Sequence, residues 1–105
     1  MFFKSELQRT LDNADALDDS NKSIVLEYVS EQIDELIHQE QFYDYDSLRS
    51  AKLSEAKTNR QNSISSDEER DVNWVKYALW ESYLLANIKD ARKIEQWIID
   101  NNNLI

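Results

Sequence analysis

The sequence of 105 residues contains no glycine, no proline and no cysteine. Without glycine no position reaches a positive φ angle cheaply, and without proline none has its φ angle fixed. Tight β-hairpins and phosphate-binding glycine loops are therefore not expected. Helices joined by Asn, Asp and Ser turns are favoured, because these side chains bond their own backbone. The lack of cysteine excludes disulfides, thiolate metal sites and cysteine nucleophiles.

Long apolar runs are missing too, since none approaches the roughly 18 to 20 residues needed to cross a bilayer. The start of the chain, Met1 to Glu6, lacks the apolar core of a secretory signal, so we expect a cytosolic protein. The length predicts one domain, residues 1–105, with a single core and little room for a deep active-site cleft. Binding is therefore favoured over catalysis, and neither enzyme activity nor a cofactor is predicted.

Positive charge is scarce in the N-terminal part of the chain. The formal net charge is −9, and residues 1–48 hold 3 basic and 12 acidic side chains. Residues 49–66 hold 4 basic and 1 acidic side chains, and residues 67–105 hold 5 and 8. A negative field of this kind repels nucleic acids and anionic membranes and attracts basic protein surfaces. A simpler alternative is that the acids keep a small protein soluble.

The densest apolar stretch runs from Val72 to Ile99 and carries all three tryptophans. From Trp74 to Ile88 the apolar side chains fall on nearly every side of a helical wheel. A helix that is apolar all round must be covered on most of its surface. We therefore predict an all-α fold, a small up-down bundle of about four helices in which the long C-terminal helix is central.

Apolar periodicity and capping residues predict helices over about 3–16, 21–41, 47–60 and 67–100. Ser20 and Asp46 are the expected caps of the second and third helices, and Ser66 with Glu69 fits a capping box for the fourth. The fourth helix would be roughly 50 Å long at 1.5 Å per residue, so either its end projects or it bends near residues 87–90. The third helix has few large apolar residues and is expected to be the most exposed.

The helix predicted over 21–41 has the clearest division into two faces. Its inward face is expected to carry Ile24, Val25, Tyr28, Val29, Ile33, Leu36 and Ile37. On or beside the other face lie Glu27, Glu31, Asp34, Glu35 and Glu40, with almost no lysine or arginine to pair with them. We predict a strongly acidic exposed surface here.

Three aromatic residues alternate with acids just after that helix, in the order Phe42, Tyr43, Asp44, Tyr45 and Asp46. Aromatic side chains on an exposed turn resemble interface anchors, which concentrate binding energy when a partner buries them. The alternative is that they fold back over the end of the bundle.

Metal binding is not predicted. Glu35 and His38 have the Glu-x-x-His spacing of carboxylate metal bundles, but His38 is the only histidine. A surface histidine is favoured. Asp44 to Asp46 resembles the start of a calcium loop, yet the glycine that such loops need is missing.

The only candidate for a basic, phosphate-binding face lies on the helix predicted over 47–60. It comprises Arg49, Lys52, Lys57 and Arg60. Four cations in so acidic a chain make a poor track for phosphates, and pairing with the acidic helix or contact with a partner is favoured.

These patterns favour a small inhibitor of the immunity-protein or antitoxin kind, which masks the active or substrate-binding surface of a basic protein such as a nuclease toxin. The predicted partner-binding residues are Glu27, Glu31, Asp34, Glu35, Phe42, Tyr43, Asp44, Tyr45 and Asp46. One alternative is a phage or plasmid anti-defence protein whose carboxylates imitate DNA phosphates. Another is a structural or adaptor module, in which the apolar C-terminal segment forms a homo-oligomeric seam.

Overall fold

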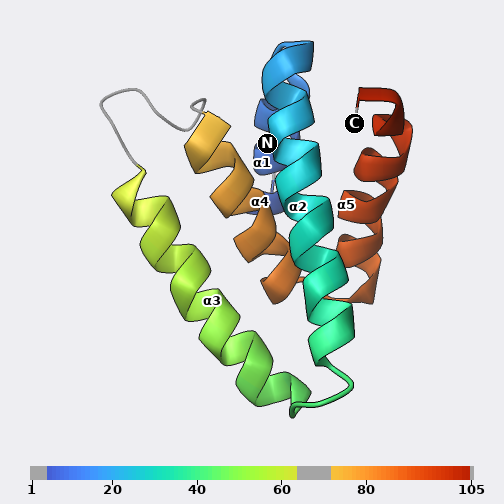
Figure 1. Ribbon diagram of the computed structural model, residues 1–105. Coiled ribbons are helices and arrows are strands. Elements are labelled where there is room, and N and C mark those ends of the chain that lie inside the picture. Colours follow the sequence, from blue (N-terminus) through green and yellow to red (C-terminus); the bar gives the residue numbers. More distant parts are fainter. Residues whose placement is uncertain (1–4, 64–71, 105) are drawn as a thin grey trace.

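The computed structural model describes residues 5–63 and 72–104, which form five α-helices and one short 3-10 helix (Figure 1). The elements are α1 (Glu6–Asp15), α2 (Asp19–Gln39), α3 (Tyr45–Asn62), α4 (Val72–Leu85), α5 (Ile88–Asp100) and η2 (Asn102–Leu104). Within these ranges there is no strand, which confirms the predicted all-α class. None of the described helices combines the length and apolar character needed to span a bilayer.

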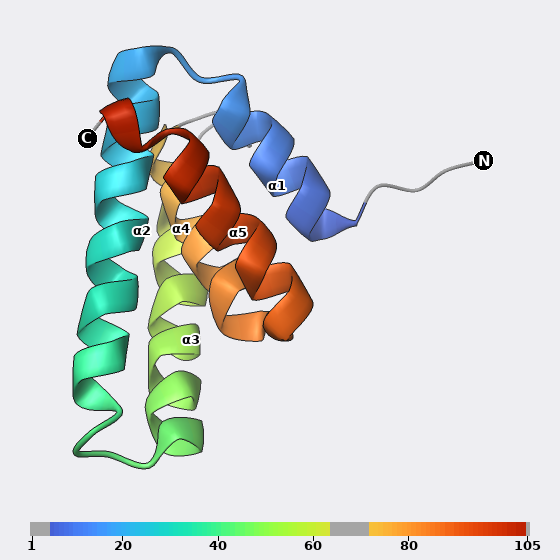
Figure 2. The ribbon, with the colours of Figure 1, turned by 90° about the vertical axis from the view of Figure 1, so that its right-hand side faces the viewer.

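Helix α4 is the central element, because α1, α2, α3 and α5 all pack against it. Figures 1 and 2 show that α2, α3, α4 and α5 run alternately down and up. The buried side chains of α4 are Trp74, Val75, Ala78, Leu79, Trp80, Glu81 and Leu84. Neighbours on several sides explain why this stretch is apolar nearly all round.

The core has two parts, and α4 contributes to both. The larger cluster brings Trp74 and Leu79 of α4 against Val25 and Val29 of α2 and Trp97 of α5. A smaller cluster joins α4 to the end of α2 and to α3, and it contains Leu36, Ala56, Trp80 and Leu84. In both clusters, α4 contacts residues that lie far away in the sequence. These contacts hold the other helices in place against α4.

The segment predicted as one helix over 67–100 contains two helices, α4 and α5, and the chain breaks where a bend near residues 87–90 was one of the two predicted alternatives. Asn87 takes an extended conformation (φ −73°, ψ 176°), and its side chain accepts the backbone N–H of Asp90 at 2.9 Å. Asn87 is thus an N-cap, and α5 runs back beside α4 (Figure 1). The all-round apolar segment also ends earlier than predicted, because Leu85 and Ile88 are 52% and 74% exposed.

Helix α2 begins at Asp19, two residues before the predicted start. Asp18 is its N-cap, and the Asp18 carboxylate accepts the backbone N–H of Asn21 at 2.8 Å. The predicted cap, Ser20, therefore lies inside the first turn. Asp18 is the cap because it directly follows the turn after α1 and has the extended backbone geometry of an N-cap residue.

Helix α3 also begins two residues earlier than predicted, at Tyr45. Asp44 is its cap, accepting the backbone N–H and the hydroxyl of Ser47 at 3.0 and 3.1 Å, so the predicted cap Asp46 lies in the first turn. The helix continues to Asn62, which makes the first part of the predicted loop helical. The predicted capping box and the predicted start of the fourth helix lie outside the described residues.

The inward face predicted for α2 is correct in its centre and wrong at two positions. Val25, Val29 and Leu36 are buried, whereas Ile24 and Ile37 are 44% and 54% exposed. Leu26, which was not among the residues predicted to face inward, is fully buried. The neighbours of α2 therefore cover a different arc of its surface from the one that periodicity alone suggests.

Candidate functional site

Four of the predicted binding residues form an acidic row on α2, and all four are exposed. They are Glu27, Glu31, Asp34 and Glu35. Counted from Glu27, the other three follow after four, seven and eight residues, so all four lie on one side of the helix. Glu35 lies 3.9 Å from the Lys52 ammonium, so this carboxylate has an in-chain counter-charge, though a distant one.

The other three carboxylates of the acidic row have no ion pair with any residue that is described. Like charges three or four residues apart on a helix destabilise it by roughly 0.2–0.5 kcal/mol for each pair. Glu31 is such a neighbour of both Glu27 and Asp34. The row therefore weakens the isolated fold slightly, and positive charge brought from outside would relieve that repulsion.

The turn between α2 and α3 lies at one end of the bundle (Figure 1). Phe42 and Tyr43 are in this turn and Tyr45 is the first residue of α3, and we call these three residues the aromatic tip. Phe42 and Tyr43 are 68% and 65% exposed, whereas Tyr45, at 44%, lies close enough to Tyr83 of α4 to contribute to the raised pKa of that phenol. The turn has defined geometry, because the backbone N–H groups of Phe42 and Tyr43 both donate to the carbonyl of Gln39, at 3.0 and 3.1 Å. The Phe42 ring also packs edge-on against the His38 ring, with centroids 5.6 Å apart.

The two acids of the tip differ in what they do. The carboxylate of Asp44 is occupied in capping α3, so it holds the turn in shape. Asp46 is exposed in the first turn of α3, where it complements the positive end of the helix dipole. The nine predicted residues thus occupy two adjoining regions, the side of α2 and the turn at its end.

The four cations of α3 do not form a basic face. Arg49 donates from Nε to the carbonyl of Leu84 at 2.5 Å, and Lys52 faces Glu35. Arg60 pairs with Glu81, at 2.6 Å. Of these four cations, only Lys57 is exposed and has no ion pair with a described side chain. Three of the four positive charges are therefore engaged by acceptors of the chain itself.

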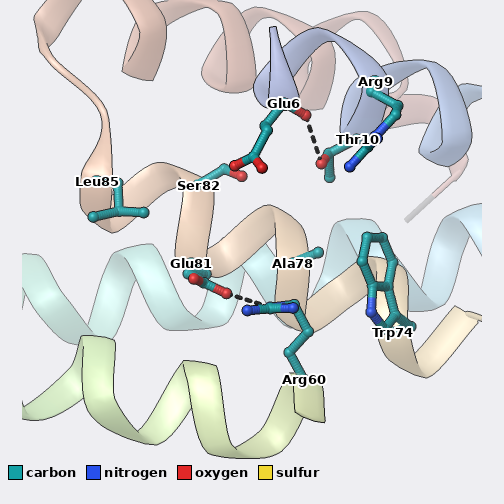
Figure 3. Close-up of a pocket in the computed structure, with 9 residues that line it drawn as sticks. All are labelled: Glu6, Arg9, Thr10, Arg60, Trp74, Ala78, Glu81, Ser82 and Leu85. Carbon is teal, nitrogen blue, oxygen red and sulfur yellow. Dashed lines mark hydrogen bonds and ion pairs between the residues drawn. The ribbon is translucent and has the colours of Figure 1, made fainter. Parts of the chain in front are cut away.

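A cavity of about 160 Å³ lies between α1, α3 and α4 (Figure 3). Its lining residues are Glu6, Arg9, Thr10, Arg60, Trp74, Ala78, Glu81, Ser82 and Leu85. Figure 3 shows the Arg60–Glu81 pair on one side and the Thr10 hydroxyl, which donates to the carbonyl of Glu6 at 2.8 Å, on the other. His38, the only histidine in the sequence, does not line this cavity. The hydroxyl groups of the cavity therefore have no imidazole base beside them.

A second concave feature, which the sequence did not reveal, is a groove between α2 and α5. It encloses about 290 Å³ and is lined by Ser30, Ile33, Asp34, Glu95, Ile98 and Ile99. Asp34 belongs both to this groove and to the acidic row. The only sequence signal was that the apolar stripe of the C-terminal segment extends to Ile98, which suggested a seam without saying which helix lies opposite.

Two tyrosines have pKa values raised to about 12. Burial is the main cause for Tyr28, with the Tyr77 hydroxyl next, and burial is again the main cause for Tyr83, with the Glu95 carboxylate next. The Tyr83 hydroxyl donates to Glu95 at 3.1 Å. In both side chains burial therefore favours the protonated phenol over the phenolate.

Among residues 5–63 and 72–104 no three His, Asp or Glu side chains are grouped in a way that could hold a metal ion. Comparison with protein-family models, with curated protein sequences and with solved structures gives no match, so no family is assigned to this chain.

Proposed function

We propose that this chain is a small acidic binding protein, an inhibitor of the immunity-protein or antitoxin kind that neutralises a basic protein by covering its active or substrate-binding surface. A nuclease toxin is an example of such a partner, because its substrate cleft must be positive to bind phosphates. The proposal places the protein in the cytosol and assigns it binding without catalysis.

The observation that carries the proposal is the acidic row on α2. Glu27, Glu31 and Asp34 are exposed on one side of the helix, and no described cation pairs with them. Repulsion between them opposes folding, so their arrangement is better explained by a partner than by stability. Complementary charge across an interface raises association rates and selects against wrong partners.

The aromatic tip supports the same proposal, because it would slow the dissociation of a bound partner. Phe42 and Tyr43 are about two-thirds exposed, at 68% and 65%, on a turn held by backbone hydrogen bonds. A turn with fixed geometry loses little entropy on binding, and aromatic side chains are frequent hot spots. The acidic row would therefore guide the encounter, and the tip would lengthen the lifetime of the complex.

The test compares two variants that carry the same net charge. The acidic-row variant Glu27→Gln, Glu31→Gln, Asp34→Asn removes three carboxylates and changes the formal net charge from −9 to −6. Each tagged protein is used to capture proteins from a lysate of the native host, and the affinity of each captured partner is measured at low and high salt. Wild type is expected to retain a basic partner and to inhibit its activity, and the acidic-row variant should bind at least about tenfold more weakly at low salt.

The control variant is Glu6→Gln, Asp90→Asn, Asp100→Asn, which removes three exposed or half-exposed carboxylates of α1 and α5 and also has a net charge of −6. It should bind as wild type does. Equal binding by all three proteins at both salt concentrations would show that the acidic row is not the interface. Release of the partner by duplex DNA would instead favour the alternative in which the carboxylates imitate DNA.

A further inference from the structure

The groove between α2 and α5 has an apolar floor. Ile33 and Ile98 pack partly against the core, and Ile99 on the rim is 64% exposed. Ile37, one turn beyond Ile33 on the same side of α2, is 54% exposed. Single exposed aliphatic residues are common on protein surfaces, but several together around a concave groove mark a binding surface.

Acidic side chains stand on both walls of this groove, Asp34 on α2 and Glu95 on α5. Asp34 has no ion pair in the described part of the chain, and Glu95 accepts a hydrogen bond from the neutral Tyr83 hydroxyl. Among the described residues, no lysine or arginine lines the groove. An apolar floor between negative walls is complementary to an apolar stripe flanked by positive charges. It disfavours a second copy of this chain, because the same acids would then face one another.

The backbone around the groove is helical and its hydrogen bonds are already made within α2 and α5. An extended strand placed here would find no backbone edge to pair with, whereas a helix satisfies its own backbone groups. Two helices that both pack on α4 also offer the surface into which the side chains of a third helix fit (Figure 1).

We propose that the α2–α5 groove binds an amphipathic helix of the partner protein, with aliphatic residues inserted between Ile33 and Ile99 and lysine or arginine residues beside Asp34 and Glu95. This inference rests on the proposed function and deepens it, since it names the part of a basic partner that the protein recognises. Asp34 joins the groove to the acidic row, so one helix lying along α2 contacts both.

The test uses a synthetic, fluorescently labelled helical peptide of about 18 residues, with leucines at i, i+3, i+4 and i+7 and lysines at the flanking positions. A second peptide has glutamate in place of every lysine. Binding to the intact protein is followed by fluorescence anisotropy at low and moderate salt. The lysine peptide is expected to bind, with an affinity that falls as salt rises, and the glutamate peptide is expected not to bind.

The groove variant is Ile37→Ser with Ile99→Ser, which changes one residue that lines the groove and one that lies a turn of α2 beyond it. It should bind the lysine peptide about tenfold more weakly. Both side chains are more than half exposed, so the variant should fold, which circular dichroism checks. The matched control is Ile24→Ser with Leu85→Ser, which changes two aliphatic residues that are 44% and 52% exposed and do not line the groove. The control should bind as wild type does.

Three results would overturn the inference: no binding of the lysine peptide, equal binding of both peptides, or equal weakening by the groove and control variants. Sedimentation of the protein alone adds a fourth, since a dimer dispersed by the groove variant would assign the groove to a second copy. None of these results would remove the proposed function, because the separate capture experiment uses a variant of Glu27, Glu31 and Asp34, of which only Asp34 lines the groove. Conversely, if capture were insensitive to the acidic row while the peptide still bound in the groove, only the role of the row would be lost.

Discussion

The guanidinium Nε of Arg60 lies 2.6 Å from Oε2 of Glu81, and this ion pair joins the end of α3 to the middle of α4. The Glu81 side chain is only 11% exposed. Because Ala56 is the one residue of α3 that is buried, apolar burial alone anchors this helix weakly. Arg49 provides a second polar link by donating to the carbonyl of Leu84 near the end of α4. Two arginines therefore hold α3 against the centre of the bundle.

Replacing Arg60 with methionine should destabilise the fold by about 2–3 kcal/mol, because the largely buried Glu81 carboxylate would lose its counter-charge. Urea unfolding followed by circular dichroism measures the change. The control is Lys57→Met on the same helix, where the side chain is exposed and little change is expected. Combining Arg60→Met with Glu81→Leu should recover much of the loss, since no buried charge then remains. Equal stability of the Arg60→Met and Lys57→Met variants would contradict this reasoning.

The role of these arginines could not be read from the sequence. Trp74 to Leu84 could be identified as the centre of the bundle, because only a helix covered on most sides tolerates so many apolar residues. For the basic residues of α3, in contrast, the sequence favours pairing with the acidic helix or contact with a partner, whereas the structure places only Lys52 beside an acid of α2. Which of them meet an acceptor depends on how α3 lies against α4, and periodicity within one helix does not contain that information.

At Asn87, too, the local sequence alone does not determine the structure. Asparagine is a modest helix former and a strong N-cap, so the sequence allowed either a bend or a new helix near this position. The new helix prevails because α5 can then return along the bundle and bury Ile94 and Trp97. The gain in apolar burial far exceeds the small cost of interrupting one helix.

Asn87→Ala should therefore lower the free energy of unfolding by about 1 kcal/mol, the usual effect of losing an N-cap side chain. Asn87→Ser retains an oxygen that can accept the backbone N–H of Asp90 and should lose only a few tenths of that amount. Thermal and urea unfolding of both variants tests this expectation. If the alanine variant were as stable as wild type, the cap would not be what starts α5.

Most of the candidate binding surface follows from the sequence, because exposed acids and aromatics can be recognised by type and spacing. The α2–α5 groove does not, since Ile33 and Ile99 meet only after the chain has reversed at Asn87. Asp44 shows a further limit of sequence reasoning. Its charge predicts a role in partner binding, yet its carboxylate also caps α3, so a variant at this position would change both the shape of the turn and its charge.

Glu31→Gln should stabilise the isolated protein by roughly 0.5 kcal/mol, because it relieves repulsion from Glu27 and Asp34. The gain should shrink as salt is added, since salt screens repulsion between exposed charges. Unfolding measured at two salt concentrations tests both points. Asp90→Asn is the control, because Asp90 lies 3.8 Å from the Lys93 ammonium and its loss should not stabilise the fold. A destabilised Glu31→Gln variant would mean that the row is held by attractive contacts.

Stability at high pH should depend on Tyr83, whose pKa burial raises from 10.0 to about 12 in the folded protein. Below pH 10 the phenol is protonated in both states, and its contribution to stability is fully present. Between about pH 10 and 12 the unfolded state ionises first, so the folded state binds more protons and the free energy of unfolding falls as the pH rises. Tyr83→Phe keeps the ring that stacks on Trp80, at 5.8 Å, but has no proton to lose. Its stability should therefore decline less steeply than that of wild type over this window, as measured by urea unfolding at a series of pH values.

Tyr43→Phe, on an exposed ring, is the matched control, and its stability should decline as that of wild type does. A wild-type slope in the Tyr83 variant would show that another group governs alkaline unfolding.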